Sequence, residues 1–169
     1  MFDRFNIEDR FDEAEQSAGG RAFSPVQMGK FRVMMGSYIN EKIKKYNLSS
    51  IHAMYIALFK KQGSLSQKDA TQFLQFDKSH SSRVFNELIE KGIIKKAEGE
   101  GGKMMTFVLT DYGGKIANDI TNLFRNWQRT MYKGVEPEDI KIYNKVQQKI
   151  FENCMEELIK ENSKNKENK

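Results

Sequence analysis

The chain has 169 residues, of which 38% are hydrophobic and 30% charged, and its formal net charge is +5 at pH 7. This length suits one domain with a buried core, and the composition is too apolar for a disordered chain. The single cysteine, Cys154, excludes an intrachain disulfide framework and suits a reducing cytoplasm. No apolar run approaches the roughly 20 residues that span a bilayer, and the first residues lack an apolar signal core. We therefore expect a cytoplasmic protein without a membrane partner, whose basic charge is compatible with nucleic acid.

The N-terminal part is predicted to contain a polar arm and two helices. Residues 1–22 are polar with a few phenylalanines and are interpreted as a loosely held arm. Pro25 suits the first turn of a helix, and apolar residues recur at helical spacing from there to Tyr46. After a break at residues 47–49, a second helical stripe follows, and Gly63 is expected to end it.

A short helix is expected to open at Ser66. With Asp69 three residues later, Ser66 resembles a capping box in which Asp takes the role of Glu. The apolar residues Ala70, Phe73 and Leu74 are expected to face the core.

A longer helix and a β-hairpin follow. The helix is predicted to begin after Asp77, as its N-cap, and to end at Gly92. Its apolar stripe comprises Val84, Phe85, Leu88 and Ile89. Residues 93–97 and 104–109 are β-prone, and the glycines between them suit a hairpin tip. In the second of these strands the alternating apolar residues are Met105, Phe107 and Leu109.

Two long amphipathic helices complete the predicted domain. Thr110 is expected to cap the first, which reaches about Lys133, and Pro137 begins the second. Their apolar stripes are Ile116, Ile120, Leu123, Phe124, Trp127 and Met131 in the first, and Ile140, Tyr143, Val146, Ile150, Cys154 and Leu158 in the second. Residues 163–169 are expected to form a disordered tail. Because the terminal helices carry more apolar surface than one copy can bury, a helical dimer interface is the natural expectation.

The helix after Asp77 also has a polar face whose side chains suit a DNA major groove. That face consists of Ser79, Ser82, Arg83 and Asn86. Arginine pairs with guanine through two hydrogen bonds, asparagine pairs with adenine, and serine bonds phosphates or base edges. An ordinary solvated helix face is the alternative interpretation. The lysines of the hairpin, Lys95, Lys96 and Lys103, favour DNA, because a basic hairpin directly after a helix-turn-helix suits a wing along the phosphate backbone.

The order of these motifs resembles the MarR family of bacterial and archaeal regulators. The resemblance rests on Leu48-Ser49, Leu65-Ser66-Gln67, Asp77-Lys78-Ser79, Ser82-Arg83, the run from Leu88 to Ile94, Leu109-Thr110 and Gly113. It implies a mainly α fold with a small β-hairpin wing, formed as one winged-helix domain over about residues 23–162. Within it, a DNA-binding lobe covers about 48–110, and long dimerisation helices cover about 24–46 and 110–161. A homodimer reading a pseudo-palindromic operator on double-stranded DNA, most often as a repressor, would follow.

The resemblance extends the set of DNA-binding candidates to Ser66, Gln67, Lys78 and His80. In the wing, this sequence differs from the family pattern. The family's wing usually carries an aspartate–arginine pair, and the corresponding positions here are Gly101 and Lys103. Lysine lacks the planar fork of arginine, so the wing is expected to contribute charge more than base selectivity.

Control by a small phenolic or aromatic ligand is a further implication of the resemblance. The candidates for lining its site are Met34, Tyr38, Tyr55, Phe59, Phe124 and Trp127, and the alternative is that they form the core. Cys154 is expected to be a buried small hydrophobe rather than a redox sensor. His52 and His80 have no second ligand at metal-binding spacing, so His52 is interpreted as a surface or packing residue. No enzymatic activity, cofactor or metal is predicted, and a protein-interaction module and a redox sensor remain the alternatives.

Overall fold

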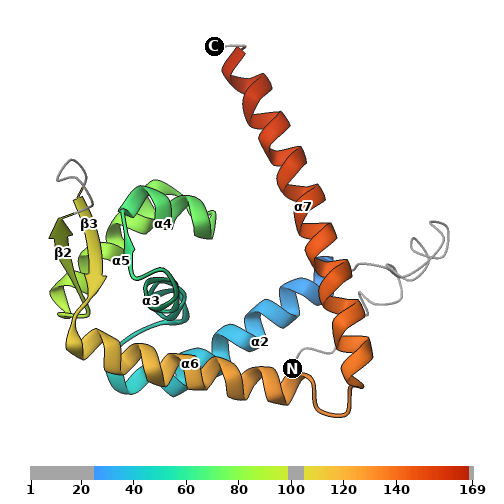
Figure 1. Cartoon of the computed structure of the whole chain (residues 1–169), viewed down its shortest axis with the longest axis horizontal. Helices are drawn as coiled ribbons and strands as arrows, with labels where there is room; N and C mark the ends of the chain where they lie inside the picture. The colour runs from blue at the N-terminus through green and yellow to red at the C-terminus, as the bar shows by residue number, and fades with distance from the viewer. Residues whose placement is uncertain (1–24, 99–104, 168–169) are drawn as a thin grey trace, which may run out of the picture. The chain divides into compact units, whose positions relative to one another are not determined.

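The computed structural model describes residues 25–98 and 105–167 (Figure 1). Its elements in chain order are α2 (Pro25–Ile43), the 3-10 helix η1 (Lys44–Tyr46), α3 (Ser50–Gln62), β1 (Ser64–Leu65), α4 (Gln67–Leu74), α5 (Lys78–Glu90), β2 (Ile94–Glu98), β3 (Met105–Leu109), α6 (Asp111–Met131) and α7 (Pro137–Glu167). They confirm the predicted mainly α chain with a small hairpin. The chain divides into two compact units, Met1–Leu123 and Phe124–Lys169. The expected arm (residues 1–22) and the glycines of the hairpin tip lie outside the described residues.

Residues with a positive φ end several of the helices. Asn47 (φ 53°) follows η1 and Gly63 (φ 79°) follows α3. Gly92 (φ 64°) follows α5, where the N–H of Ile93 donates to the carbonyl of Leu88 at 2.9 Å. This bond and a second from the Gly92 N–H to Ile89 form a Schellman motif, which satisfies carbonyls that the helix end leaves open. The predicted helix ends at Gly63 and Gly92 are thus confirmed.

Helices α4 and α5 each begin at a side-chain N-cap. Ser66 accepts a hydrogen bond from the Asp69 N–H at 3.1 Å, and Asp77 accepts one from the His80 N–H at 2.8 Å. Gln75 adopts the left-handed conformation (φ 55°) that closes α4. Because serine and aspartate accept from the open N–H groups of a first turn, both predicted helix starts are observed.

The sheet has three antiparallel strands in the order β1-β3-β2. β2 and β3 form the predicted hairpin, with Lys96 opposite Phe107. Strand β1 was not predicted. It contains two residues, Ser64 and Leu65, paired with Val108 and Phe107, and two residues are too few to show an alternating pattern.

The core of the first unit is centred on Phe85 of α5. Its ring makes edge-on contacts with Tyr55 and Phe59 of α3, with ring centres 5.6 Å apart in both pairs, and with Phe107 of β3 at 5.0 Å. All four side chains are buried. Such aromatic pairs add to the stabilisation from apolar burial. They join α3, α5 and β3 into one body.

Phe73, which was predicted to face the core, and Met105, one of the alternating apolar residues of the second predicted strand, are both exposed. Phe73 of α4 is 57% exposed and Met105 of β3 is 56% exposed. The buried side of α4 is centred on Ala70, and its half-buried neighbours Thr71 and Leu74 lie to one side of it. Phe73 projects on the other side, because three residues turn a helix short of a full turn. Met105 lies at the end of β3 that is remote from the buried Ile93 and Ile94.

The beginning of α6 is held against the end of α5. The Thr110 hydroxyl donates to the carbonyl of Gly92 at 2.6 Å and accepts from the Gly113 N–H at 2.9 Å. An ideal Cβ on Gly113 would lie 2.0 Å from the carbonyl oxygen of Ile93. Only glycine therefore permits this approach, and the predicted cap at Thr110 is observed.

Helix α7, in the second unit, carries its apolar stripe on its surface. Among its exposed residues are Ile142, Tyr143, Val146, Ile150, Phe151 and Leu158. Cys154 is also exposed, so the prediction that it is buried is wrong within a single chain. The helix continues to Glu167. It therefore includes much of the segment 163–169 that was predicted to be a disordered tail, because lysine, glutamate and asparagine without proline or glycine do not interrupt a helix.

Candidate nucleic-acid interface

The predicted reading face of α5 lies on the surface. Ser79, Arg83 and Asn86 are exposed and Ser82 is half-buried, whereas Val84, Phe85 and Leu88 on the opposite side are buried. This separation of faces follows the helical period of 3.6 residues. Four side chains that can bond bases or phosphates thus lie together on the exposed side of α5, and the opposite side of the helix is packed into the core.

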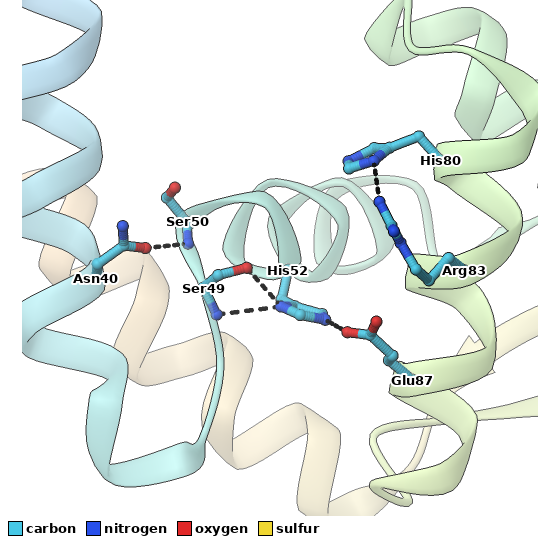
Figure 2. Close-up of polar contacts among 7 residues, drawn as sticks. All are labelled: Asn40, Ser49, Ser50, His52, His80, Arg83 and Glu87. Atoms are coloured by element: carbon cyan, nitrogen blue, oxygen red, sulfur yellow. Dashed lines mark hydrogen bonds and ion pairs between the residues drawn. The ribbon is translucent and has the colours of Figure 1, made fainter.

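Arg83 is oriented by a neighbour on its own helix. Its Nη2 lies 3.1 Å from Nδ1 of His80, one turn earlier (Figure 2). A guanidinium only donates, so Nδ1 of His80 is the acceptor and its proton is on Nε2. The His80 ring lies against Phe76, with ring centres 5.7 Å apart, and Phe76 stacks on Tyr55 at 6.0 Å. The arginine is therefore supported through His80 and Phe76 by the core.

The hydroxyl of Ser79 is already engaged in the cap of α5. It donates to Oδ1 of Asp77 at 2.5 Å. This bond, with the N–H of His80, holds the pKa of Asp77 below its ordinary value of 3.8. The free lone pairs of Ser79 leave it able to accept from a base or a bound water. Lys78, the first residue of α5, is exposed beside it, where it adds charge to the positive end of the helix.

An open depression of about 690 Å³ lies over α4 and the start of α5. Its lining consists of Gln67, Lys68, Thr71, Gln72, Gln75, Phe76 and Lys78. It brings together two predicted candidates, Gln67 and Lys78. Lys68, Gln72 and Gln75 were not predicted; amide and ammonium groups at such a position suit phosphate contacts. Ser66 is buried, and its hydroxyl is engaged with Asp69, so its role here is the cap.

The described part of the wing carries two of the predicted lysines. Lys95 and Lys96 of β2 are both exposed, and as successive strand residues they point to opposite faces of the hairpin. Lys103 lies outside the described residues, as does Gly101, so the departure from the family's aspartate–arginine pair stays a prediction.

Two polar contacts that were not predicted from the sequence join α3 to α5. The Tyr55 hydroxyl donates to Oγ of Ser81 at 2.7 Å, and Ser81 is fully buried. Nε2 of His52 lies 2.7 Å from Oε2 of Glu87. Burial raises the pKa of Tyr55. It also lowers the pKa of His52 below the ordinary 6.5, although the carboxylate of Glu87 opposes that shift. His52 is thus a packing residue, one of the two roles expected for it.

The six candidates for a ligand site do not behave alike. Tyr55 and Phe59 are fully buried in the Phe85 core, as the alternative interpretation expected. Met34 is 60% exposed and Tyr38 half-buried on α2. Phe124 and Trp127 are half-buried in the second unit. Tyr55 and Phe59 have no surface left for a ligand in this conformation.

Within the described ranges, 25–98 and 105–167, no three His, Cys, Asp or Glu residues are grouped so as to hold a metal ion. None of the helices described there is both long enough and apolar enough to cross a membrane.

No family model matches the chain. A curated relative, the HTH-type transcriptional regulator BilQ of Clostridioides difficile (strain CD3), is 26% identical over 97 residues. That match covers 57% of this chain and 66% of the relative, slightly less than two thirds of its length.

Solved structures resemble the chain much more extensively. The transcriptional regulator SlyA superposes with a TM-score of 0.73 at 16% identity, over 79% of this chain and 96% of that one. A MarR protein from Peptoclostridium difficile DA00132 gives 0.73 at 15% identity, over 84% and 98%. A SlyA-like transcription regulator from Listeria monocytogenes gives 0.72 at 20%, over 79% and 90%.

A helix-turn-helix followed by an antiparallel hairpin defines the winged-helix class of folds. Within that class, the long helices before and after the hairpin and these superpositions show that the fold is that of the MarR family of transcriptional regulators.

Proposed function

We propose that the chain is a MarR-family transcriptional regulator of the cytoplasm, which binds a pseudo-palindromic operator in double-stranded DNA as a homodimer and represses transcription. The observation that carries the proposal is the exposed face of α5, on which Arg83 is oriented by His80 beside Ser79, Ser82 and Asn86. The name of the BilQ relative, an HTH-type transcriptional regulator, supports it. The function is binding rather than catalysis.

The homodimer is supported by the apolar surface of α7. Its exposed Val146, Ile150 and Leu158 are each at least 40% accessible in the single chain. Monomeric soluble proteins rarely expose a long contiguous apolar stripe. A second copy of the same helix, related by a two-fold axis, would cover the stripe and place two reading helices on successive major grooves.

The proposed effector is a small aromatic compound that weakens operator binding. Of its six predicted contacts, Tyr55 and Phe59 are occupied in the core. Met34 and Tyr38 of the first unit, and Phe124 and Trp127 of the second, stay predictions as ligand contacts. Titrating a panel of small phenolic compounds into the operator complex tests the proposed effector, and unchanged operator affinity across the whole panel would contradict it.

Selection of bound fragments from genomic DNA tests operator recognition directly. The expected product is an inverted repeat with half-sites about one helical turn apart. Recovery of DNA without any shared motif would contradict the proposal and favour a winged-helix module that binds proteins.

Arg83 is the most informative position for a variant. We expect Arg83→Ala to cost roughly 1–3 kcal/mol of operator binding, because an arginine pairs with guanine through two bonds. Arg83→Lys keeps the positive charge but loses the planar guanidinium with its paired donors. It should therefore retain non-specific binding and lose discrimination at one base pair. Lys115→Ala, on the exposed surface of α6, is the control. Equal losses on operator and random DNA in Arg83→Lys would exclude base reading by this residue.

Oxidant sensing remains the second candidate because one observation favours it. The Cys154 thiol is exposed in the single chain, and an accessible thiol is a requirement for oxidation. A peroxide response of operator binding that persists in Cys154→Ser would eliminate this function.

A further inference from the structure

Three residues form a polar bridge from the start of α3 to the reading helix. In this Ser49–His52–Glu87 bridge, the backbone N–H of Ser49 donates to Nδ1 of His52 at 3.1 Å (Figure 2). The Ser49 hydroxyl lies 2.7 Å from the same nitrogen. On the other side of the ring, Nε2 faces Oε2 of Glu87 at 2.7 Å. The side chain of His52 is only 8% exposed, whereas that of Glu87 is 40% exposed.

The chemistry of these partners determines the state of the imidazole. A backbone N–H only donates, so Nδ1 of His52 carries a lone pair. The ring proton is therefore on Nε2, where it donates to the carboxylate of Glu87. His52 thus takes the place that a glutamate has in a capping box, since it accepts from the N–H of the cap residue Ser49. One ring both caps α3 and contacts α5.

The bridge supplies the second of two anchors on α5. The first is the bond from Tyr55 to Ser81, and both anchors come from successive turns of α3. Ser81 and Glu87 are six residues apart, about 9 Å along the helix axis. One contact fixes a point on a helix, whereas two contacts at different heights also fix its rotation about its own axis.

The rotation of α5 determines where the base-reading side chains point. Glu87 follows Asn86 directly and lies one turn after Arg83, so a change of rotation at Glu87 moves both. The start of α3 is itself tied to α2, because the N–H of Ser50 donates to Oδ1 of Asn40 at 2.5 Å. The bridge therefore continues a polar connection from α2 through α3 to α5 (Figure 2).

We propose that His52 is a positioning residue for DNA recognition: through Glu87 it fixes the rotation of α5 at which Arg83 and Asn86 meet base edges, without touching DNA itself. This inference rests on the proposed function. It assigns sequence specificity to a buried side chain of α3 that no base can reach.

Two substitutions of His52 separate its two contacts. Asparagine places its amide oxygen near the position of Nδ1, so His52→Asn keeps an acceptor for the Ser49 N–H and loses the donor to Glu87. Glutamine places its amide nitrogen near the position of Nε2, so His52→Gln keeps that donor and loses the cap acceptor. His52→Asn removes one contact, that with Glu87, whereas His52→Gln removes the contacts of Nδ1 with both the N–H and the hydroxyl of Ser49. The variant that is expected to keep its specificity is therefore the one that loses more contacts, so a loss of specificity in His52→Asn alone is not explained by poorer folding.

The measurement is the ratio of operator affinity to random-DNA affinity for each variant. We expect His52→Asn to lower the ratio roughly tenfold, the size typical of residues that act through a neighbour, and His52→Gln to stay within about twofold of wild type. Equal ratios in the two variants would overturn the inference. Glu87→Ala should match His52→Asn and Glu87→Gln should match wild type; because Glu87 is partly exposed, these variants serve if those of His52 fold poorly.

A spectroscopic readout separates this inference from the proposed function. In the DNA-free protein, long-range ¹H–¹⁵N spectra should show the Nε2–H tautomer of His52. The amide resonances of residues 83–87 should shift in His52→Asn and not in His52→Gln. If the wild type selects no operator, the proposed function fails while these spectra still decide whether His52 positions α5. A wild type that selects an operator, with variants that leave residues 83–87 unchanged, would contradict only the inference.

Discussion

At the scale of single residues, Gly113 is the position at which backbone packing most strictly requires a glycine. Its neighbour Gly114 has nothing within 4 Å of an added Cβ, whereas at Gly113 the carbonyl oxygen of Ile93 would lie at 2.0 Å. The two adjacent glycines of α6 therefore differ in whether the fold requires them. One is required by the approach of α6 to the end of α5, and the other is only a weak helix former.

Alanine substitutions distinguish these two roles. We expect Gly113→Ala to destabilise the fold by roughly 1–3 kcal/mol, because the backbone must move to relieve the overlap. Gly114→Ala should stabilise it by up to about 1 kcal/mol, since alanine is the better helix former. Urea denaturation followed by circular dichroism measures both, and a stabilised Gly113→Ala would contradict this packing.

Asp77 gives a prediction with a pH dependence. Its pKa is lowered in the folded state, mainly by the Ser79 hydroxyl and also by the His80 N–H. The carboxylate therefore stabilises the fold at pH values above 3.8, and that stabilisation is lost as the pH falls below 3.8 through the folded-state pKa.

We expect Asp77→Ala to lower the melting temperature at pH 7 more than Asp77→Asn does, because asparagine retains a cap acceptor. The difference between wild type and Asp77→Asn should shrink on acidification below pH 3.8. Asp139→Asn in the first turn of α7 is the control for lost charge. Thermal melts over a pH series measure the effect, and a difference independent of pH would show that the carboxylate charge has no part in the cap.

At the scale of elements, α7 has an apolar face without a counterpart in its own unit. The face is exposed at Ile142, Val146 and Ile150, which recur every four residues and so form one side of the helix. This stripe along a 31-residue helix is the surface that the proposed dimer would cover. The dimer proposal gives the stripe its partner.

A charge placed on this stripe should separate the proposed dimer. Val146→Glu is expected to raise the dimer dissociation constant at least about a hundredfold, because each copy would bury an unpaired carboxylate. Asn144→Glu adds the same charge two residues away, on the opposite side of the helix, and should leave the dimer intact. Sedimentation velocity measures both variants. A dimeric Val146→Glu protein would remove α7 from the interface.

At the scale of the whole molecule, the net charge of +5 and the exposed wing lysines predict that the affinity for DNA depends on salt concentration. Each phosphate contact contributes about −0.9 to the slope of log affinity against log salt concentration. We expect the double variant Lys95→Ala/Lys96→Ala to reduce the slope by roughly 0.9 per lost contact, on operator and random DNA alike. Removing Lys141 and Lys145 of α7 changes the net charge equally and should leave the slope unaltered. An unchanged slope in the wing variant would show that the wing does not lie on the backbone.

Features that depend on neighbours in the chain were predictable from the sequence. The caps at Ser66 and Asp77, the stop at Gly92 and the exposed side of α5 all follow from hydrogen bonds or periodicity within a few residues. The winged-helix order, and with it the reading face, therefore followed from the sequence.

Only the tertiary structure decided the contacts between distant segments. Tyr55 meets Ser81, and His52 meets Glu87, across 26 and 35 positions. Strand β1 exists only because β3 lies beside it, and Phe73 is exposed because the packing of α4 is centred on Ala70. Helical periodicity predicts which face of α5 is turned to the core. It does not predict which other helix or strand packs against that face. The face proposed to read DNA is thus local in origin, whereas the angle at which it is held depends on packing between segments.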